Sequence, residues 1–565
     1  MKTMMKIPSV LLLVLLLLIA VGCSNIDSNS LQDDVGTGSS EASPTQSDAE
    51  KTSNDAEKIV GGTLTFAFAG PIQGDVLDPA ATSNNKNFRV LRSIYDSLVT
   101  ELPDHTVAPW LATSWTISED NKSYTFSLRK DVKFHDGTPF NAEAVKFNFD
   151  RLKDPNSKAS NGEAATLLGP FLSAEVLDEY KIQINFETPY VPFLINLTKA
   201  SFGMVSPEAV KKYGDQFAQN PVGTGPFKFT KLVPGEEIHL ERNPDYNWAP
   251  PTAKHDGAAY LERLVFKSVP EEATRVSVLQ SKQAQVIDTV PPQNIIGFKG
   301  DRAYQVLDAE LSGINYGLWL NSNRAPLNDR SVRQALKLAT DVDAIVNTLY
   351  LGTFKRATGL LTANLRGTDG TSESGYKPDL EQAKKLLEEA GWKTGKDGIR
   401  EKDGKRLELT VVELTGNREK RQDIDMIVQQ QWKAIGVELK IDVLASGGYV
   451  ENVSKGIYDI AGGSWGGGDP DVLRVKLLSE NQNGLYNTAQ LNDKEIDQWL
   501  TEGYQEFDAA KRKQLYDNIE KKVAEEAFYI PIYILPYTIA ATSNTKDLWL
   551  DQAGLPNFGD VWLEP

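Results

Sequence analysis

Short runs of apolar and β-branched residues, several of them alternating with polar positions, predict β-strands along this chain. These runs lie at residues 61–69, 182–186, 264–267 and 437–443. Apolar residues recur at helical spacing between them, at residues 88–98, 380–390 and 515–523. Gly391 follows the second of these helices, where glycine can cap a C-terminus. The pattern predicts a mixed α/β fold, and no fixed-period repeat points to a solenoid or a propeller.

The most specific stretch is residues 115–150, WTISEDNKSYTFSLRKDVKFHDGTPFNAEAVKFNFD. Alternation at residues 124–128 predicts a half-buried strand, and Asp-Gly-Thr-Pro at 136–139 predicts a turn in which glycine supplies a positive φ. A helix should follow, with Asn141 as its N-cap, because an asparagine oxygen can accept from the free amides of the first turn.

Three further motifs follow in order: NPVGTGPF at 220–227, ERNPDY at 241–246 and PLNDRSVRQALKLATD at 326–341. Together with residues 115–150, they resemble the landmarks of the extracytoplasmic solute-binding proteins of ABC importers, family 5. This is the oligopeptide-, dipeptide- and nickel-binding family. The resemblance extends over most of the chain after residue 60.

The resemblance implies an α/β fold of the periplasmic-binding-protein type (type II, cluster C-like). It is a two-lobed clamp with an extra subdomain and a two-strand hinge that closes on a ligand. The implied parts are lobe I (61–107, 226–314 and 536–565), the extra subdomain of lobe I (108–225) and lobe II (315–535). The chain would cross between the lobes near residues 314–320 and 528–535, which are both strand-like.

The N-terminus carries a processing signal. Lys2 and Lys6 are followed by an apolar run at residues 10–19, which is too short to span a membrane comfortably and is typical of a signal peptide. Small residues precede Cys23, the only cysteine, as in a bacterial lipobox. We therefore expect a signal peptide at 1–22 and a lipidated Cys23; the alternative is an ordinary thiol in a conventional signal peptide.

Composition then limits the rest of the chain. Residues 24–58 are polar and almost without large apolar groups, so residues 23–60 are expected to form a lipidated, disordered tether. A single cysteine excludes an intramolecular disulfide framework and a multi-cysteine metal site. The net charge of −17 and the pI of about 4.9 argue against nucleic acid as a partner.

The main candidate site is the glycine-rich run YDIAGGSWGGGDPDVL at 458–473, which matches the family's cleft loop. In peptide-binding relatives a tryptophan here is followed three residues later by an acidic residue that pairs with the peptide's α-ammonium group. The chain has Trp465 but a shorter loop, with Gly467 and Gly468 before Asp469, which either substitutes for that acid or starts a turn. Trp465 can stack on a ligand or pack in the core.

Weaker candidates lie elsewhere. Tyr316 and Trp319 alternate sides with apolar neighbours in the first expected crossing strand, so they either face the cleft or pack in the core. Gln73 follows the first strand, and α/β sheets bind ligands beyond the carboxyl ends of strands; a solvated loop is the alternative.

An enzyme is not expected. Residues 462–466 match the GxSxG pattern of α/β-hydrolases around Ser464, but those enzymes place the catalytic histidine after the serine. All four histidines precede Ser464 and lack metal-ligand spacing, so we expect neither a metal site nor a cofactor. They are His105, His135, His239 and His255, of which His135 is interpreted as a structural turn residue.

The sequence therefore predicts an extracytoplasmic solute-binding lipoprotein, monomeric and anchored by lipid to the outer face of the bacterial cytoplasmic membrane. It would deliver a small solute to the transmembrane subunits of an ABC permease. The expected solute is an oligopeptide or dipeptide. An oligosaccharide and a metal chelate, such as a nickel chelate, are the alternatives. A secreted hydrolase using Ser464 and a purely structural surface lipoprotein are the alternatives from other classes.

Overall fold

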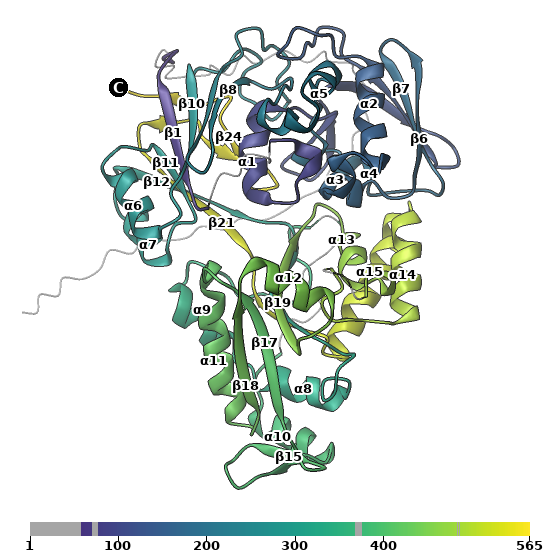
Figure 1. Ribbon diagram of the computed structural model, residues 1–565, viewed down its shortest axis with the longest axis vertical. Coiled ribbons are helices and arrows are strands. Elements are labelled where there is room, and N and C mark those ends of the chain that lie inside the picture. The colour runs from purple at the N-terminus through teal and green to yellow at the C-terminus, as the bar shows by residue number, and fades with distance from the viewer. Residues whose placement is uncertain (1–57, 71–76, 366, 368–375, 483, 485) are drawn as a thin grey trace, which may run out of the picture. The chain divides into compact units, whose positions relative to one another are not determined.

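A seven-stranded mixed sheet organises the first part of the fold (Figure 1). A computed structural model describes residues 58–70, 77–365, 367, 376–482, 484 and 486–565. The strand order is β12 (Tyr304–Glu310), β21 (Pro536–Thr542), β11 (Val286–Asp288), β1 (Thr63–Phe68), β10 (Arg263–Ser268), β9 (Glu237–Arg242) and β8 (Phe227–Val233). β1 runs parallel to both of its neighbours. We call the part built on this sheet lobe I.

Helices bury both faces of this sheet. Leu64 and Phe66 of β1 point into one core together with Leu91 of α1 (Asn85–Ile94). Ala67 points to the opposite face, into a core shared with α6 (Glu272–Gln280) and α7 (Pro292–Lys299). Because both faces are covered, four of the six residues of β1 are apolar.

A five-stranded sheet organises lobe II. Its order is β18 (Glu438–Leu444), β17 (Glu408–Leu414), β19 (Ile460–Gly466), β13 (Gly313–Leu320) and β20 (Tyr529–Tyr533), with β17 parallel to β18 and β19. One face packs on α8 (Arg330–Leu338), α9 (Val342–Tyr350), α10 (Leu380–Glu389) and α11 (Arg421–Lys433). The other packs on α13 (Val472–Leu477), α14 (Lys494–Gln505) and α15 (Ala509–Glu525), and Figure 1 shows α9 and α11 on the opposite side from α14 and α15.

A third, antiparallel sheet has the order β4 (Ala112–Ile117), β5 (Ser123–Leu128), β7 (Lys181–Phe186) and β6 (Phe171–Asp178). Its inner face packs on α2 (Ala142–Lys153) and on α4 (Phe193–Asn196). The shorter elements are β2 (Val99–Glu101), β3 (Val107–Pro109), α3 (Glu163–Leu167), α5 (Pro207–Tyr213), β14 (Lys393–Thr394), β15 (Arg400–Lys402), β16 (Lys405–Arg406), α12 (Ser446–Ser454), β22 (Thr545–Lys546), β23 (Trp549–Leu550), β24 (Pro556–Asn557) and β25 (Trp562–Leu563).

Most local predictions are confirmed. The Asn141 side chain accepts from the amide of Ala144 at 3.0 Å and caps α2. Gly137 and Gly391 have φ of 85° and 89°, as the expected turn and helix cap require. The helix expected at 88–98 instead ends at Ile94, because the following residues pair with a neighbouring segment: the carbonyl of Leu98 accepts from the amides of residues 110 and 112.

The chain passes between the two large sheets twice. The passages lie between β12 and β13 and between β20 and β21, and the amide of Leu311 in one donates to the carbonyl of Leu535 in the other at 3.0 Å. The expected crossing segments, 314–320 and 528–535, are therefore mostly strands of lobe II, with the sheet-to-sheet passage at their edges. The lobe and subdomain boundaries as such stay predictions.

None of the helices in the described ranges is long and apolar enough to cross a membrane. The signal peptide, Cys23 and nearly all of the tether lie outside the described residues, and so does Gln73.

Candidate functional site

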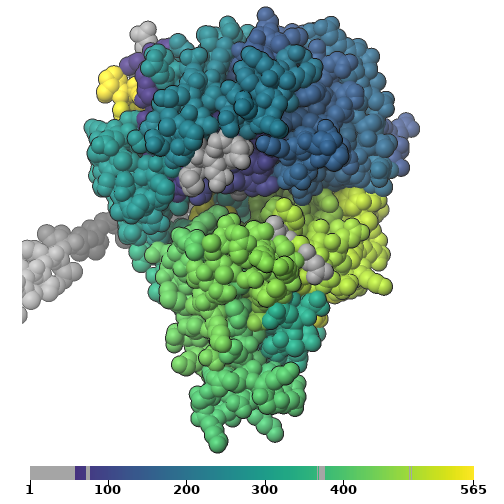
Figure 2. Space-filling view, in the orientation of Figure 1, coloured from purple at the N-terminus to yellow at the C-terminus, as the bar shows by residue number. Residues whose placement is uncertain are grey.

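A cavity of about 610 Å³ lies between lobe I and lobe II. Its walls are the C-terminal ends of β1 and β19, the loop after β17, the N-terminal half of α1 and the two passages between the sheets. This is the edge of an α/β sheet at which ligands bind, beyond the carboxyl ends of strands. We call it the larger cavity. Figure 2 shows the surface along which lobe I, mainly purple to teal at the top, meets lobe II, mainly green and yellow below.

The lining of the larger cavity is basic, although the chain has a net charge of −17. Five basic side chains line it against three acidic ones: Lys86, Arg89, Arg275, Arg418 and Lys420 against Glu163, Glu272 and Glu419. A cavity of this sign inside an acidic protein favours a ligand with a negatively charged group.

Two of the arginines are held by lobe I itself. Arg89 forms an ion pair with the buried carboxylate of Asp288 and lies 3.9 Å from the ring centroid of Tyr537. Arg275 is buried and donates to four backbone carbonyls, among them those of Asp288 and Thr289 at 2.9 Å. Both guanidinium groups therefore have structural partners.

In lobe II, Glu419 accepts from Arg418 at 2.5 Å and from Arg421 at 2.7 and 3.1 Å. The hydroxyl of Tyr533 donates to the same carboxylate at 2.9 Å. Burial alone would raise the pKa of Glu419, but the two guanidinium groups outweigh it and hold the pKa at about 2. The Glu419 carboxylate is therefore negatively charged, and its partners are Arg418, Arg421 and Tyr533.

The two lysines of the lining differ from the arginines. No hydrogen bond or ion pair joins the ammonium group of Lys86 or of Lys420 to another residue that the structure describes. Burial lowers the pKa of Lys86; Asp288 opposes this, and Arg418, Arg89 and Arg275 lower it further. Sequence reasoning did not select these lysines, because a lone basic residue near a helix start or in a loop gives no sign of which way it points.

Trp465 lies at the end of β19, and Ser464, Trp465 and Gly466 line the larger cavity. Its ring packs edge-to-face on Tyr486, with centroids 5.2 Å apart, and the Lys476 ammonium group lies 5.2 Å from its centroid. The indole is thus half-buried and held from the lobe II side. Its role as a ligand contact stays a prediction.

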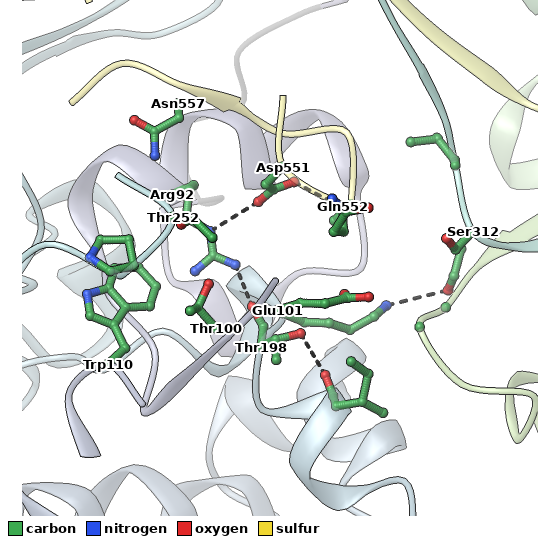
Figure 3. A pocket seen from close by; sticks show the side chains of 18 of the residues that line it. Arg92, Thr100, Glu101, Trp110, Thr198, Thr252, Ser312, Asp551, Gln552 and Asn557 are labelled. Atoms are coloured by element: carbon green, nitrogen blue, oxygen red, sulfur yellow. Dashed lines mark hydrogen bonds and ion pairs between the residues drawn. The ribbon is translucent and has the colours of Figure 1, made fainter. Parts of the chain in front are cut away.

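Gly467 and Gly468 line a second cavity of about 90 Å³, which we call the smaller cavity (Figure 3). A Cβ at Gly468 would lie 3.0 Å from Ile195 Cγ1 and 3.8 Å from Glu101 Oε2. The Lys199 ammonium group lines the smaller cavity and donates to two residues that line the larger one, to Glu163 at 2.8 Å and to the carbonyl of Gly466 at 3.4 Å. Gly468 therefore allows lobe II to approach α4 closely, whereas a Cβ at Gly467 would lie 2.9 Å from Val472 of lobe II itself.

Asp469 is buried in lobe II. Its carboxylate accepts from Arg512 at 2.5 Å and from the amide of Asp471 at 2.8 Å. These contacts explain the residue as the start of the turn into α13. In peptide-binding relatives an acidic residue three positions after the tryptophan binds the α-ammonium group of the peptide. That Asp469 takes over this role stays a prediction.

Tyr316 and Trp319 are fully buried and point to opposite faces of the lobe II sheet. Tyr316 stacks on Tyr533 with centroids 4.7 Å apart, and Trp319 packs on Tyr529 at 4.5 Å. Neither side chain lines the larger or the smaller cavity, so the geometry favours the core-packing alternative for both.

No histidine in the described ranges is bonded to Ser464. Each has another partner: His105 bonds to Glu101 at 2.7 Å, His135 to the Gly225 carbonyl at 2.9 Å, His239 to Glu237 at 3.0 Å and His255 to the Gly559 carbonyl at 3.1 Å. Within those same ranges no three His, Cys, Asp or Glu side chains are arranged to hold a metal ion.

Two lobes joined by paired passages, with a charged cavity between them, define a solute-binding protein of the clamp type. The family model for bacterial extracellular solute-binding proteins, family 5 (middle), matches residues 106–484, and the chain belongs to this family. The family and fold predictions are confirmed. The protein is the extracytoplasmic solute-binding component of an ABC importer, it is not an enzyme, and it binds a small solute for delivery to a permease.

Individual relatives have different ligands. The chain is 28% identical over 483 residues to the probable D,D-dipeptide-binding periplasmic protein DdpA of Escherichia coli K12, covering 83% of this chain and 88% of that protein. The structure resembles DppA from Helicobacter pylori in complex with the peptide STSA (TM-score 0.76, 26% identity, 90% and 99% coverage). It also resembles NikA from Brucella suis in complex with Fe(III)-EDTA (TM-score 0.78, 28% identity, 88% and 100% coverage).

Proposed function

We propose that the solute is an oligopeptide or dipeptide, held in the larger cavity and enclosed when the lobes close. The observation that carries this proposal is the basic cavity lined by both lobes at the passages between the sheets. A peptide supplies a carboxylate for the basic side chains and apolar groups for Trp465. The similarity to the D,D-dipeptide-binding DdpA and to DppA with its bound peptide supports this class.

A metal chelate is the second candidate, because the same basic lining suits a polyanionic chelate. The similarity to NikA in complex with Fe(III)-EDTA supports it. Such a chelate would bring its own metal ligands, so it would need few from the protein. No specific observation favours an oligosaccharide over these two.

The first test is a thermal-shift screen of residues 57–565, which form one compact unit. Peptide pools, oligosaccharides, and nickel or iron with chelators are compared on the wild type and on Trp465→Ala. A ligand at a hundredfold excess over its Kd stabilises by about 2.7 kcal/mol. A shift with peptides alone, reduced by Trp465→Ala, supports the peptide class; a shift with chelates alone contradicts it.

We also propose that Cys23 is lipidated after cleavage of residues 1–22 and that residues 23–60 tether the protein to the outer face of the membrane. The apolar run followed by small residues and a cysteine supports this. Mass spectrometry of the mature N-terminus tests it, and Cys23→Ser is expected to release the protein from membranes. Retention of Cys23→Ser on membranes would contradict lipid anchoring.

A further inference from the structure

Lys476 in lobe II is a buried cation without an acidic partner. It lies in the last turn of α13 and is only 6% exposed. Its ammonium group donates to the Thr488 hydroxyl at 3.5 Å, which is long for a hydrogen bond, and it forms no ion pair with any residue that the structure describes. Burial lowers the pKa of Lys476 to about 8, so the side chain is mostly charged at neutral pH. A buried lysine is usually paired, so another kind of group has to stabilise this one.

The acidic groups on the elements around Lys476 have other partners. Asp469 accepts from Arg512, Asp471 from Arg474, Asp493 from Lys522, Asp497 from the amide of Ser479 and Glu520 from the amide of Leu361. Glu480, in the turn after α13, is exposed. β13 and β19 share a core with α13 and contain no charged residue. The contacts of the Lys476 ammonium group within the described ranges are therefore with uncharged groups.

The ring of Trp465 takes the place of a counter-ion. The Lys476 ammonium group lies over this ring, 5.2 Å from its centroid, and Tyr486 packs edge-to-face on the same ring. A cation is attracted to the face of an indole, and more strongly where water is excluded. The indole N–H of Trp465 is buried and has no hydrogen-bond acceptor among the described residues. The position of the ring therefore depends on Lys476 and Tyr486 rather than on a hydrogen bond.

The same ring lines the larger cavity, whereas Lys476 lines neither cavity. An indole that already holds one cation is a poorer site for a second, because the two positive charges repel each other and solvent screens them little in a half-buried place. An apolar group gains the same contact with the ring whether or not the ring holds a cation. Lys476 can therefore influence which ligand groups are accepted at Trp465 without touching the ligand.

We propose that Lys476 is a positioning residue that holds Trp465 in place and makes this part of the larger cavity prefer an apolar ligand side chain to a basic one. The inference rests on the proposed function and narrows the peptide class by its side chains. It does not involve the termini of the peptide. Lys476 acts through the ring of Trp465, so its effect must disappear when the ring is removed.

The binding test is a double-mutant cycle with tetraalanine and tetralysine, measured by isothermal titration calorimetry. We expect Lys476→Met to lower the preference for tetraalanine over tetralysine by about three- to tenfold. In the Trp465→Ala background the same substitution should leave the preference unchanged. Lys476→Arg, which keeps the charge, should retain more of the preference than Lys476→Met. An equal change of preference in both backgrounds would overturn the proposal, because it would show a long-range effect of charge.

Lys522 supplies the matched control. Its ammonium group also lies over a tryptophan, 5.7 Å from the ring centroid of Trp499, but it is paired with Asp493 and Glu495 at 2.8 and 2.7 Å. Neither Lys522 nor Trp499 lines the larger or the smaller cavity. Lys522→Met should therefore leave the preference between the two peptides unchanged. A change as large as that of Lys476→Met would overturn the specific role of Lys476.

A second test needs no ligand. The fluorescence of Trp465 is obtained as the difference between the wild type and Trp465→Phe, and it is followed from pH 6.5 to pH 9.5. We expect a transition with a midpoint near pH 8, where Lys476 loses its proton, and no such transition when the same difference is measured in the Lys476→Met background. A transition that is missing in the wild type, or that persists without Lys476, would overturn the contact.

The two tests separate the two levels of the argument. If the wild type bound neither peptide, the proposed function would fail, and the side-chain preference would fail with it. The fluorescence titration would still decide whether Lys476 positions Trp465. If tetraalanine bound and the cycle showed no coupling between the two residues, the peptide class would stand and the role of Lys476 would be overturned.

Discussion

At the scale of single residues, Asp96 shows how one buried carboxyl joins distant motifs. It follows α1 and accepts from Thr224 at 2.9 Å, from the Trp248 indole at 3.0 Å and from the Tyr246 hydroxyl at 3.4 Å. Burial raises its pKa to about 7, against the pull of these donors and of Arg92. The motifs at 220–227 and 241–246 are thus linked to the same carboxyl.

His135 performs a similar task for the turn at 136–139. Its Nε2 donates to the Gly225 carbonyl at 2.9 Å and its Nδ1 accepts from the Gly223 amide at 3.4 Å, an arrangement that requires the neutral ring. Burial lowers its pKa to about 4. The interpretation of His135 as a structural turn residue agrees with these contacts.

We predict that this histidine makes the protein less stable in acid. The pKa of His135 is about 6.5 in the unfolded chain and about 4 in the folded chain. Its contribution to the free energy of unfolding is therefore fully present above pH 6.5 and is lost as the pH falls toward 4. Its full size is on the order of 3 kcal/mol. Urea unfolding of the wild type and His135→Gln at pH 7.5 and pH 5 tests this.

The wild type should exceed the variant in free energy of unfolding by more at pH 7.5 than at pH 5. The comparison between the two proteins is needed because Asp96, with its raised pKa, acts in the opposite direction: its contribution is lost as the pH rises from about 4 toward 7. The same difference at both pH values would contradict the role given to His135.

At the scale of elements, the end of α1 depends on a close approach by the 220–227 loop. The Gly225 amide donates to the carbonyl of Ile94 at 2.8 Å, and a Cβ on Gly225 would lie 2.6 Å from the carbonyl carbon of Ile94. A real side chain there has no room, because its nearest neighbours are backbone atoms. The glycine in this motif is therefore required by packing.

We expect Gly225→Ala to lower the free energy of unfolding by about 2–3 kcal/mol, because the loop must move away from α1. Gly297→Ala in α7 is the matched control: a Cβ there meets nothing within 4 Å, so alanine should be neutral or stabilise by up to about 1 kcal/mol. Urea unfolding of both variants tests the difference. A cost for Gly225→Ala no larger than that for Gly297→Ala would contradict the steric explanation.

At the scale of the whole molecule, lobe II makes hydrogen bonds to the rest of the protein in addition to the two passages between the sheets. Lys199 follows α4 in the part built on the third sheet, and it bonds to Glu163 and to the carbonyl of Gly466 in lobe II. The amide of Val191, just before α4, donates to the carbonyl of Tyr504 in lobe II at 2.9 Å. These contacts can form only when lobe II lies close to the part built on the third sheet, so they stabilise the closed arrangement of the two.

The double variant Lys199→Met/Glu163→Gln removes the link without leaving a buried charge unpaired. We expect it to bind tetraalanine a few-fold more weakly, because closure is less favourable, with little loss of stability. Lys211→Met/Glu208→Gln, an exposed ion pair on α5, is the control and should bind as the wild type does. Wild-type affinity in the first variant would show that Lys199 does not contribute to closure.

The local structure was largely predictable from the sequence. The strand at 124–128, the turn at 136–139 and the cap at Asn141 depend on neighbours within a few residues, and the structure contains all three. The motifs were also sufficient to indicate the family. Motif residues such as Gly225 and His135 are closely packed against other parts of the fold, so the fold requires these residue types at these positions.

The binding surface could not be predicted in the same way. Tyr316 and Trp319 lie on opposite faces of one strand, as the alternation of side chains predicts. Helices cover both faces of that strand, and no local sequence pattern reveals this. Lys86 and Lys420 are more than 300 residues apart and become neighbours of one cavity only through the arrangement of two sheets. The sequence by itself determined the elements, the family and the role in transport, since these follow from short-range patterns and motifs; the tertiary structure alone decided which charges face the solute, because it brings together residues that are distant along the chain.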